Sequence, residues 1–208
     1  MLKLIMVSIH PIFPTLIGIG KIENHADYLP MFLRLLGGKT NDNKSCPDLK
    51  HTPDIRSNIP EFLDILTREV TQYANHHFGL KDDRCEWICN NAWLNESGDG
   101  AFQTSHNHAN TFLSVVYYVD FPDGASQTRL LRPEVHMHPF MRFDPDFYHE
   151  GNYEYVSPGV ETGNFLIFPS YLRHEVPPNI NPTRSRITLA CNYMPSRIDY
   201  NSYVMEIK

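Results

Sequence analysis

Apolar residues recur along this chain at two periods, first at helical spacing and later at strand spacing. In residues 25–36, apolar side chains stand at i, i+3, i+4 and i+7, the spacing of one helical face, and two glycines follow. A second stripe of this kind runs through residues 57–79, with Ser57 as a candidate N-cap and Gly79 as the stop. The pattern therefore predicts two helices before residue 85.

From residue 85 onward the period shortens, and the predicted elements are strands. Four apolar or aromatic runs are separated by Pro, Gly, Asn and Asp, as is typical of strands: residues 86–94, 111–121, 164–169 and 186–193. Helices followed by strands favour an α+β fold, mainly β, with the N-terminal helices packed outside a sheet. We expect one domain over residues 1–208, with a helical part (1–84) and a β-rich part (85–208).

The segment 123–163 interrupts the strand pattern and is rich in Pro, Asp, His and Tyr. A loop of this length within a compact domain is usually functional or contains short strands. The segment contains these aromatic and basic side chains: Phe140, Phe143, Phe147, Arg129, Arg132 and Arg142. They could cover a binding site or pack on one another at the surface, and the sequence does not favour one of these arrangements over the other.

Composition excludes some classes of partner. The chain has 208 residues, is 41% hydrophobic and carries a formal net charge of −6 without a dense Lys/Arg run, so an extended nucleic-acid interface is not expected. No apolar stretch reaches the ~18 residues that span a bilayer, and the opening residues do not resemble a signal peptide. We expect a cytoplasmic protein with no membrane partner. The oligomeric state stays open.

The cysteines give a weak signal. Cys85 and Cys89 have a C-x3-C spacing, but a second pair for a metal site is lacking among the four cysteines. We interpret all four as ordinary buried or half-buried thiols.

The stretch QTSHNHANTFLSVVYYVDFP, residues 103–122, contains the first candidate for chemistry. Alternate side chains of a strand face the same way, so His106 and His108 can both point at one metal ion if a strand begins before them. If that parity continues without a bulge, alternate residues from Phe112 to Tyr118 share this face. The alternative is a polar loop whose imidazoles meet water or carbonyl oxygens. A second His-x-His pair, in the segment 136–138, ranks below the first because no long strand follows it.

The stretch GNFLIFPSYLRHEVPPN, residues 163–179, leads a predicted buried strand to His174. Its neighbour Glu175 is a poor metal ligand beside His174, because adjacent strand residues point to opposite faces. Further on, Arg186 opens RITLACNY, a strand whose small and polar residues alternate with apolar ones. We interpret this strand as having one face that lines a cavity and an opposite, apolar face that packs against the core. Taken alone, Arg186 could also be a charged residue at the surface. The three large aromatics near these motifs are assigned to the core: Trp87, Trp93 and Phe168.

Together these motifs resemble a known family. H-x-H-x-N followed by S-V-V-Y-Y-V, with F-P-S-Y-L-x-H-x-V-P and R-I-T-x-x-x-N, is similar to a bacterial and phage family of 2-oxoglutarate/iron(II)-dependent dioxygenases. The resemblance covers nearly the whole chain and is strongest in residues 103–118 and 163–192. It implies a double-stranded β-helix, a jelly-roll or cupin-like barrel, that holds iron at one open end.

The resemblance also implies roles for individual residues. His106, His108 and His174 would bind the metal, Arg186 would bind the distal carboxylate of 2-oxoglutarate, and Tyr118 would lie at the cosubstrate. Arg184 is the alternative anchor, and Tyr118 is nearly as well explained as a core aromatic. One departure concerns His108, which stands where such enzymes usually have a carboxylate. Three imidazoles also suit Zn, Cu or Ni, so either all three histidines bind iron or one is only a neighbour.

The expected function is that of an iron(II)- and 2-oxoglutarate-dependent oxygenase that uses O₂ to hydroxylate a small molecule, an amino-acid side chain or a peptide. The sequence does not identify the substrate. Two alternatives remain: a cupin-like metal enzyme that does not use 2-oxoglutarate, and a catalytically silent metal-binding barrel. The side chain of Arg186 distinguishes the cupin-like enzyme from the oxygenase, because a side chain that points away from the metal would favour the cupin-like enzyme.

Overall fold

The computed structural model describes residues 14–79, 85–133, 153–180, 184–200 and 202–207. Two helices lie on the outside of a sheet: α1 (His25–Leu36) and α2 (Pro60–Phe78), with a short 3-10 turn, η1 (Arg56–Asn58), before α2. α1 has the predicted bounds, and Gly79, in a left-handed conformation at φ 62°, ends α2 as predicted.

The described residues form strands in the order that follows: β1 (Gly18–Lys21), β2 (Asn41–Asp42), β3 (Leu49–His51), β4 (Trp87–Ser97), β5 (Gln103–His106), β6 (Leu113–Asp120), β7 (Arg129–Leu131), β8 (Tyr155–Val156), β9 (Asn164–Pro169), β10 (His174–Val176), β11 (Arg186–Pro195), β12 (Arg197–Tyr200) and β13 (Tyr203–Glu206). All four predicted strands are present, as β4, β6, β9 and β11. The segment 123–163 contains the short strands β7 and β8, which is one of the two possibilities we had considered for it.

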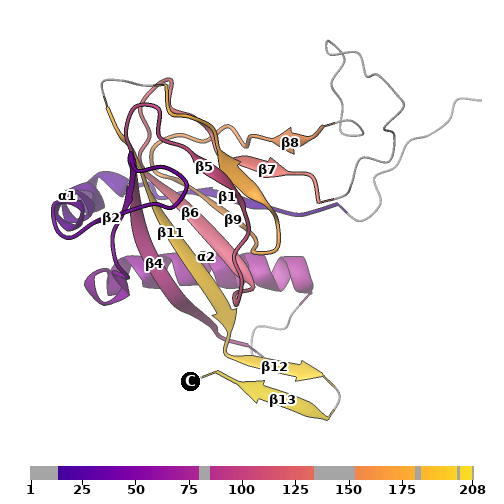
Figure 1. Ribbon diagram of the computed structural model, residues 1–208. Helices are drawn as coiled ribbons and strands as arrows, with labels where there is room; N and C mark the ends of the chain where they lie inside the picture. Colours follow the sequence, from indigo (N-terminus) through magenta and orange to yellow (C-terminus); the bar gives the residue numbers. More distant parts are fainter. Residues whose placement is uncertain (1–13, 80–84, 134–152, 181–183, 201, 208) are drawn as a thin grey trace, which may run out of the picture.

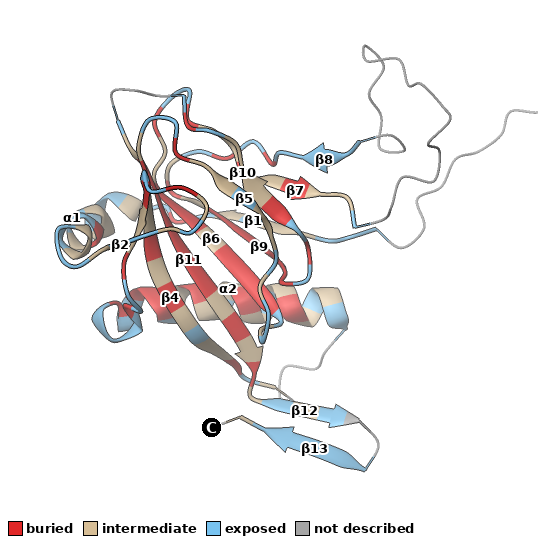
Figure 2. Ribbon diagram, in the orientation of Figure 1, coloured by how far each residue is buried: buried red, intermediate tan, exposed pale blue. Residues whose placement is uncertain are grey.

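Two antiparallel sheets make up the body of the protein (Figure 1). The larger has the order β1-β9-β6-β11-β4-β3-β2, and the smaller has the order β5-β10-β7-β8. α2 crosses one face of the large sheet, and the small sheet lies on the other side (Figure 1). The strands β12 and β13 pair only with each other among the described strands, and β13 is exposed along its length (Figure 2). The predicted α+β, mainly β fold with external helices is confirmed.

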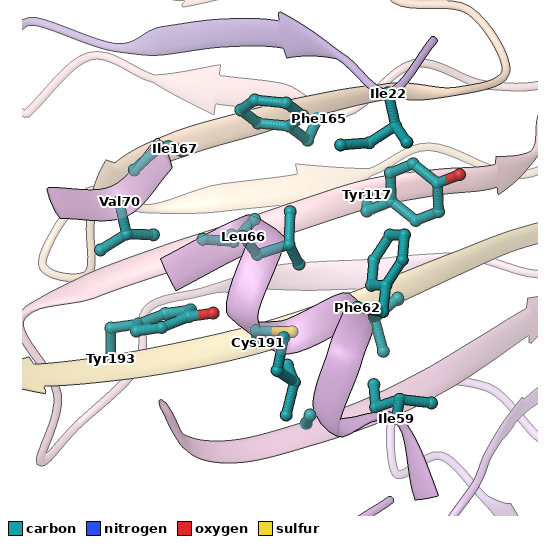
Figure 3. Close-up of a cluster of buried hydrophobic side chains, with 14 of the residues drawn as sticks. Ile22, Ile59, Phe62, Leu66, Val70, Tyr117, Phe165, Ile167, Cys191 and Tyr193 are labelled. Atoms are coloured by element: carbon teal, nitrogen blue, oxygen red, sulfur yellow. The ribbon is translucent and has the colours of Figure 1, made fainter. Parts of the chain in front are cut away.

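The main core lies between α2 and the large sheet (Figure 3). Phe62 of α2 is 1% exposed, and its ring centroid lies 5.0 Å from that of Phe32 of α1 and 4.8 Å from that of Tyr117 of β6. Edge-on and tilted aromatic contacts of this kind stabilise a core beyond their buried area. Phe62 therefore joins both helices to the sheet.

One expectation about local structure was wrong. Ser57 does not cap α2, because Ile59 takes the N-cap position without a side-chain hydrogen bond and Ser57 lies in η1. Pro60 explains this start, since proline favours the first helical position and keeps the preceding residue out of helical conformation.

The strand that begins before His106 does not continue into β6, because β5 ends at His106 and the chain crosses to the large sheet through Asn110, whose φ is 59°. The predicted shared face is nevertheless present from Ser114 to Tyr118: Ser114 contacts His108, Val116 lines the cavity and Tyr118 lies at Arg186.

Trp87 and Phe168 are buried in the core as predicted, but Trp93 lines a cavity instead. It lies on the face of β4 that points away from the helices, so its assignment to the core was wrong.

The cysteines are free thiols, of which Cys46 and Cys191 are buried and Cys85 and Cys89 half-buried, as predicted. Among the residues that the structure describes, no helix is both long enough and apolar enough to cross a membrane.

The position of Phe62 predicts a large loss of stability on its removal. We expect Phe62→Ala to lower the free energy of unfolding by about 3 to 5 kcal/mol, because it leaves a cavity where three aromatic rings meet. Leu33→Ala is the control, since Leu33 lies on α1 with 46% of its side chain exposed, and it should cost less than about 1 kcal/mol. Urea unfolding monitored by circular dichroism measures both. Equal losses in the two variants would contradict this description of the core.

Candidate metal and cosubstrate site

A cavity of about 500 Å³ lies between the two sheets. The large sheet contributes side chains from β4, β6 and β11, and the small sheet contributes side chains from β5 and β10. On β11 the predicted alternation is confirmed, because the four residues from Arg186 onward at every second position line the cavity: Arg186, Thr188, Ala190 and Asn192. The residues between them belong to the helix-covered core: Ile187, Leu189, Cys191 and Tyr193.

Two of the predicted histidines are held side by side by the small sheet. β5 and β10 are antiparallel, and His174 is the direct partner of His106 in their register. Opposed residues of this kind have neighbouring side chains on one face, and the two imidazole centroids are 4.2 Å apart. If β10 were shifted by one residue against β5, Glu175 would lie opposite His106. In the observed register Glu175 points to the other face of the sheet, where it pairs with Arg129 at 3.5 Å.

The third histidine reaches the same place from a loop. His108 follows the end of β5, and its backbone N–H donates to the Ser170 carbonyl at 3.1 Å. Its ring centroid lies 5.3 Å from that of His106 and 5.1 Å from that of His174. The ligand atoms of the three imidazoles lie within 4.8 Å of one another.

Hydrogen bonds fix which ring nitrogen each histidine offers. The Nδ1 of His106 lies 2.8 Å from the Thr104 carbonyl oxygen, and the Nδ1 of His174 lies 3.0 Å from the Leu172 carbonyl oxygen. A carbonyl oxygen only accepts, so each Nδ1 carries the proton and donates it, which leaves the Nε2 lone pair free.

The ring of His108 is held by side chains rather than by a backbone carbonyl. Its Nδ1 lies 2.6 Å from Oδ1 of Asn192 and 3.1 Å from Oγ of Ser114. Donation from Nδ1 to the amide oxygen of Asn192 gives His108 the same tautomer as the other two histidines. Hydrogen bonds of this type orient metal-binding imidazoles in proteins. Asn192 lies within the R-I-T-x-x-x-N motif, but only the folded structure connects it with His108.

Burial keeps the three imidazoles neutral. It lowers the pKa of His106 and of His108, and it lowers the pKa of His174 to about 3, to which the neighbouring imidazoles also contribute. Three neutral imidazoles with free Nε2 atoms form a donor set that fits iron(II) as well as zinc, copper or nickel. Among the described residues, this is the one group of three or more candidate ligands.

Arg186 lies in the same cavity with its charge unpaired by any described carboxylate. Its side chain is 3% exposed, one terminal nitrogen donates to Oγ1 of Thr128 at 3.0 Å, and its Nε has no partner. Its guanidinium carbon lies 5.4 Å from the centre of the Tyr118 ring. A buried unpaired cation is unfavourable by itself, and burial lowers its pKa, so an anionic ligand would stabilise the site.

Arg184 points elsewhere. Its side chain is 60% exposed and pairs with Asp120 at 2.6 Å, and it is absent from the cavity lining. Of the two candidate arginines, Arg186 is therefore the one that faces the cavity.

Tyr118 is fully buried, and its hydroxyl donates to Oγ1 of Thr128 at 2.8 Å. Thr128 itself lines the cavity and connects Tyr118 with Arg186. Thr128 could not be predicted as a site residue, because it stands in the irregular segment after residue 122, outside every motif.

Some candidates fall outside this description. His136 and His138, together with Phe140, Arg142, Phe143 and Phe147, lie outside the described residues.

The two facing antiparallel sheets form a jelly roll, and the three imidazoles and the arginine between them form a candidate metal and cosubstrate site. Residues 91–192 match a family described as "Putative 2OG-Fe(II) oxygenase". This segment is therefore similar to the 2-oxoglutarate/iron(II)-dependent oxygenases, oxidoreductases that use iron(II), 2-oxoglutarate and O₂. The resemblance in the motifs is thereby confirmed.

Solved structures agree on the fold. An oxidoreductase of the 2OG-Fe(II) oxygenase family from Burkholderia pseudomallei is 18% identical, with coverage of 81% of this chain and 76% of that one and a TM-score of 0.54. A prolyl-4-hydroxylase from Pseudomonas putida is 16% identical, with coverage of 86% and 92% and a TM-score of 0.56. HygX from Streptomyces hygroscopicus, solved with nickel, 2-oxoglutarate and hygromycin B, is 11% identical, with coverage of 88% and 84% and a TM-score of 0.59. The predicted double-stranded β-helix is confirmed. None of the curated proteins matches this chain.

The buried state of His174 predicts a pH dependence of stability in the metal-free protein. Its folded pKa of about 3 lies below the ordinary value of 6.5, so the unfolded chain binds more protons between these values. Stability should therefore fall as the pH drops below about 6.5, and this one group should account for about 2 kcal/mol between pH 7 and pH 5. Urea unfolding in the presence of a chelator measures the effect.

His174→Gln should remove this part of the pH dependence, because glutamine does not titrate. His76→Gln is the control, since His76 is exposed on α2, and it should keep the full dependence. If His174→Gln also kept it, burial of a neutral imidazole would not be its source.

Proposed function

We propose that His106, His108 and His174 bind iron(II) through their Nε2 atoms and that Arg186 binds the distal carboxylate of 2-oxoglutarate. The observation that carries this proposal is the presence, in one cavity, of three converging neutral imidazoles and a buried arginine without a carboxylate partner among the described residues. The first group suits a divalent metal, and the second suits a dianionic cosubstrate.

The cosubstrate end of the cavity has further support from Thr128. Its Oγ1 accepts hydrogen bonds from both the Tyr118 hydroxyl and the Arg186 guanidinium. The hydroxyl proton of Thr128 is therefore left to donate to a third group, and a carboxylate beside Arg186 is a suitable acceptor. Tyr118 would act through Thr128, which it holds in place, rather than by touching 2-oxoglutarate itself.

With iron(II), 2-oxoglutarate and O₂ bound, enzymes of this family oxidise a C–H bond while 2-oxoglutarate becomes succinate and CO₂. The residues of this chain would bind and orient the reactants. The imidazoles would hold the metal, the arginine would select the length of the cosubstrate, and the two sheets would shield the reactants from water.

For the substrate, we propose an amino-acid side chain, within a peptide or free, that is hydroxylated. The likeness in fold to the prolyl-4-hydroxylase of Pseudomonas putida supports a peptidyl substrate, whereas the likeness to HygX supports a small molecule. The cupin-like alternative without 2-oxoglutarate requires an arginine that turns away from the metal. Because Arg186 faces the cavity, the oxygenase is the better supported of the two.

The hydrogen bond from Nδ1 of His108 to Oδ1 of Asn192 leads to a prediction about the loss of that acceptor oxygen. Asn192→Leu keeps the size of the side chain but cannot accept the Nδ1 proton, and we expect metal affinity to fall about 10- to 100-fold. Asn192→Asp retains an acceptor and should restore most of the affinity, and Asn90→Leu, on the exposed side of β4, should leave it unchanged. Calorimetric titration with nickel(II), which is stable in air, measures the affinities. Full affinity in Asn192→Leu would exclude His108 as an oriented ligand.

The experiment that tests the whole proposal is 2-oxoglutarate binding to anaerobic protein loaded with iron(II). Bidentate binding produces a metal-to-ligand charge-transfer band in the visible, which we expect for the wild type and not for His174→Ala. Arg186→Leu should raise the dissociation constant of 2-oxoglutarate at least about thirtyfold, because truncating one partner of a buried charge pair costs about 2 kcal/mol or more.

Arg184→Leu is the matched control for Arg186→Leu and should bind 2-oxoglutarate normally, since Arg184 pairs with Asp120 outside the cavity. The metal-free Arg186→Leu protein should be at least as stable as the wild type, because it loses a buried unpaired cation. Loss of the band in Arg184→Leu alone would make Arg184 the anchor. Iron binding without a band at saturating 2-oxoglutarate would favour the cupin-like enzyme, and no iron binding would favour the silent barrel.

A further inference from the structure

One wall of the cavity has no part in binding the metal or the cosubstrate. Along β4, alternation directs Asn91, Trp93 and Asn95 into the cavity, while the residues between them, Ala92 and Leu94, are buried in the core. His51 of β3 is the register partner of Asn95, and Gln103 of β5 lines the same cavity from the small sheet. We name these five residues the amide wall: His51, Asn91, Trp93, Asn95 and Gln103.

The amide wall and the cosubstrate end lie on different sides of β11. In the large sheet β6 borders β11 on one side and β4 borders it on the other. The guanidinium of Arg186 lies near Tyr118 of β6, on the first side. The ring of Trp93 lies on the second side, with its centroid 5.8 Å from that of His108. A molecule bound on the amide wall would therefore be next to the proposed metal without displacing the cosubstrate.

Several polar groups of the amide wall have unused hydrogen-bonding capacity. Oδ1 of Asn95 accepts from Nε1 of Trp93 at 3.2 Å, which leaves the N–H groups of this amide. Nε2 of Gln103 donates to Oγ of Ser45 at 3.1 Å, which leaves the amide oxygen.

Asn91 adds a further open carboxamide, because its half-buried side chain has no hydrogen bond to any described residue. His51 also lines the cavity, but its Nδ1 is buried and out of reach of a ligand there. Carboxamides with unused donors and acceptors suit a ligand that supplies both.

The same wall offers no free charge. Asp54 is the one carboxylate among the described lining residues, and it already accepts from Nε of Arg56 at 2.9 Å and from the Ala92 backbone N–H at 3.2 Å. Arg186, the one lining arginine, lies at the cosubstrate end. A charged group on the amide wall would lose its hydration without meeting an opposite charge, and such burial is strongly unfavourable.

We propose that the amide wall binds the substrate through an uncharged group that both donates and accepts hydrogen bonds, namely a carboxamide or a peptide amide. This inference rests on the proposed function, because it takes the site next to the metal as the substrate site. The ring of Trp93 supplies a flat apolar surface for the carbon atoms beside the amide, and the carboxamides of Asn91, Asn95 and Gln103 match its polar atoms.

Three probes with one backbone test the proposal: N-acetylglutamine methylamide, which is neutral, and the corresponding glutamate and lysine compounds, which are charged. The chain has two tryptophans, so Trp87→Phe leaves Trp93 as the single indole, and its fluorescence reports binding at the amide wall directly. The titrations are run on protein loaded anaerobically with iron(II) and 2-oxoglutarate, and again on metal-free protein. The charge-transfer band records separately whether loading has occurred.

We expect the glutamine probe to change the fluorescence saturably and to bind at least about tenfold more tightly than either charged probe. Asn95→Asp, made in the same background, keeps the acceptor for Trp93 but introduces a negative charge. This substitution should lower the affinity for the glutamine probe at least about tenfold and raise the affinity for the lysine probe. Asn58→Asp, at an exposed position in η1, is the matched control and should change neither.

Each contrary result overturns the inference. These results are tighter binding of a charged probe to the wild-type wall, no saturable response to the glutamine probe up to its solubility limit, and unchanged preferences in Asn95→Asp. If the charge-transfer band does not form but the metal-free protein shows the expected order of probes, the amide wall stands and the proposed function fails. If the band forms but the three probes bind in a different order of affinity, the proposed function stands and the proposal about the amide wall is refuted.

Discussion

Side-chain alternation along β11 is the constraint on which both the stability and the site depend. This strand is hydrogen-bonded to β4 on one side and to β6 on the other, so its register is fixed along nearly its whole length. Ile187 and Leu189 on one face are buried against the helices, whereas Arg186 and Asn192 on the other face line the cavity. A slip of one residue would exchange the two faces. The core that stabilises the protein is therefore also what directs the arginine and the asparagine toward the site.

The three imidazoles are oriented in two different ways. His106 and His174 each donate to the carbonyl two residues earlier in the chain, Thr104 and Leu172, so their tautomer is a local property of their strands. His108 stands where such oxygenases usually have a carboxylate, and its orientation comes from Asn192, 84 residues away in the chain. In the proposed site a neutral imidazole would thus take the usual place of a charged ligand, and its orientation comes from the tertiary structure.

The cavity holds its unpaired charge on one side of β11. Its cosubstrate end contains a buried cation with a threonine that can donate, whereas the opposite wall contains carboxamides, an indole and a carboxylate already paired with Arg56. Electrostatics therefore direct an anion to one end and leave the other end selective for neutral groups. The ring of His108 lies beside Trp93 on this wall, so the proposed site would hold one reactant by charge and the other by hydrogen bonds.

Features that depend on residues close together in the chain could be predicted from the sequence. Periodicity gave α1 and β9 at their observed bounds and gave the two faces of β11, because helix and strand spacing are local, and the motifs gave the three histidines and Arg186 as candidates. Three contacts of the site became visible only in the folded protein: the pairing of His174 with His106, the contact of Asn192 with His108 and the position of Thr128 between Tyr118 and Arg186. It also moved Trp93 from the expected core into the cavity. These contacts join residues that are distant in the chain, and strand register between distant segments is fixed by the packing of the whole sheet, which no local pattern encodes.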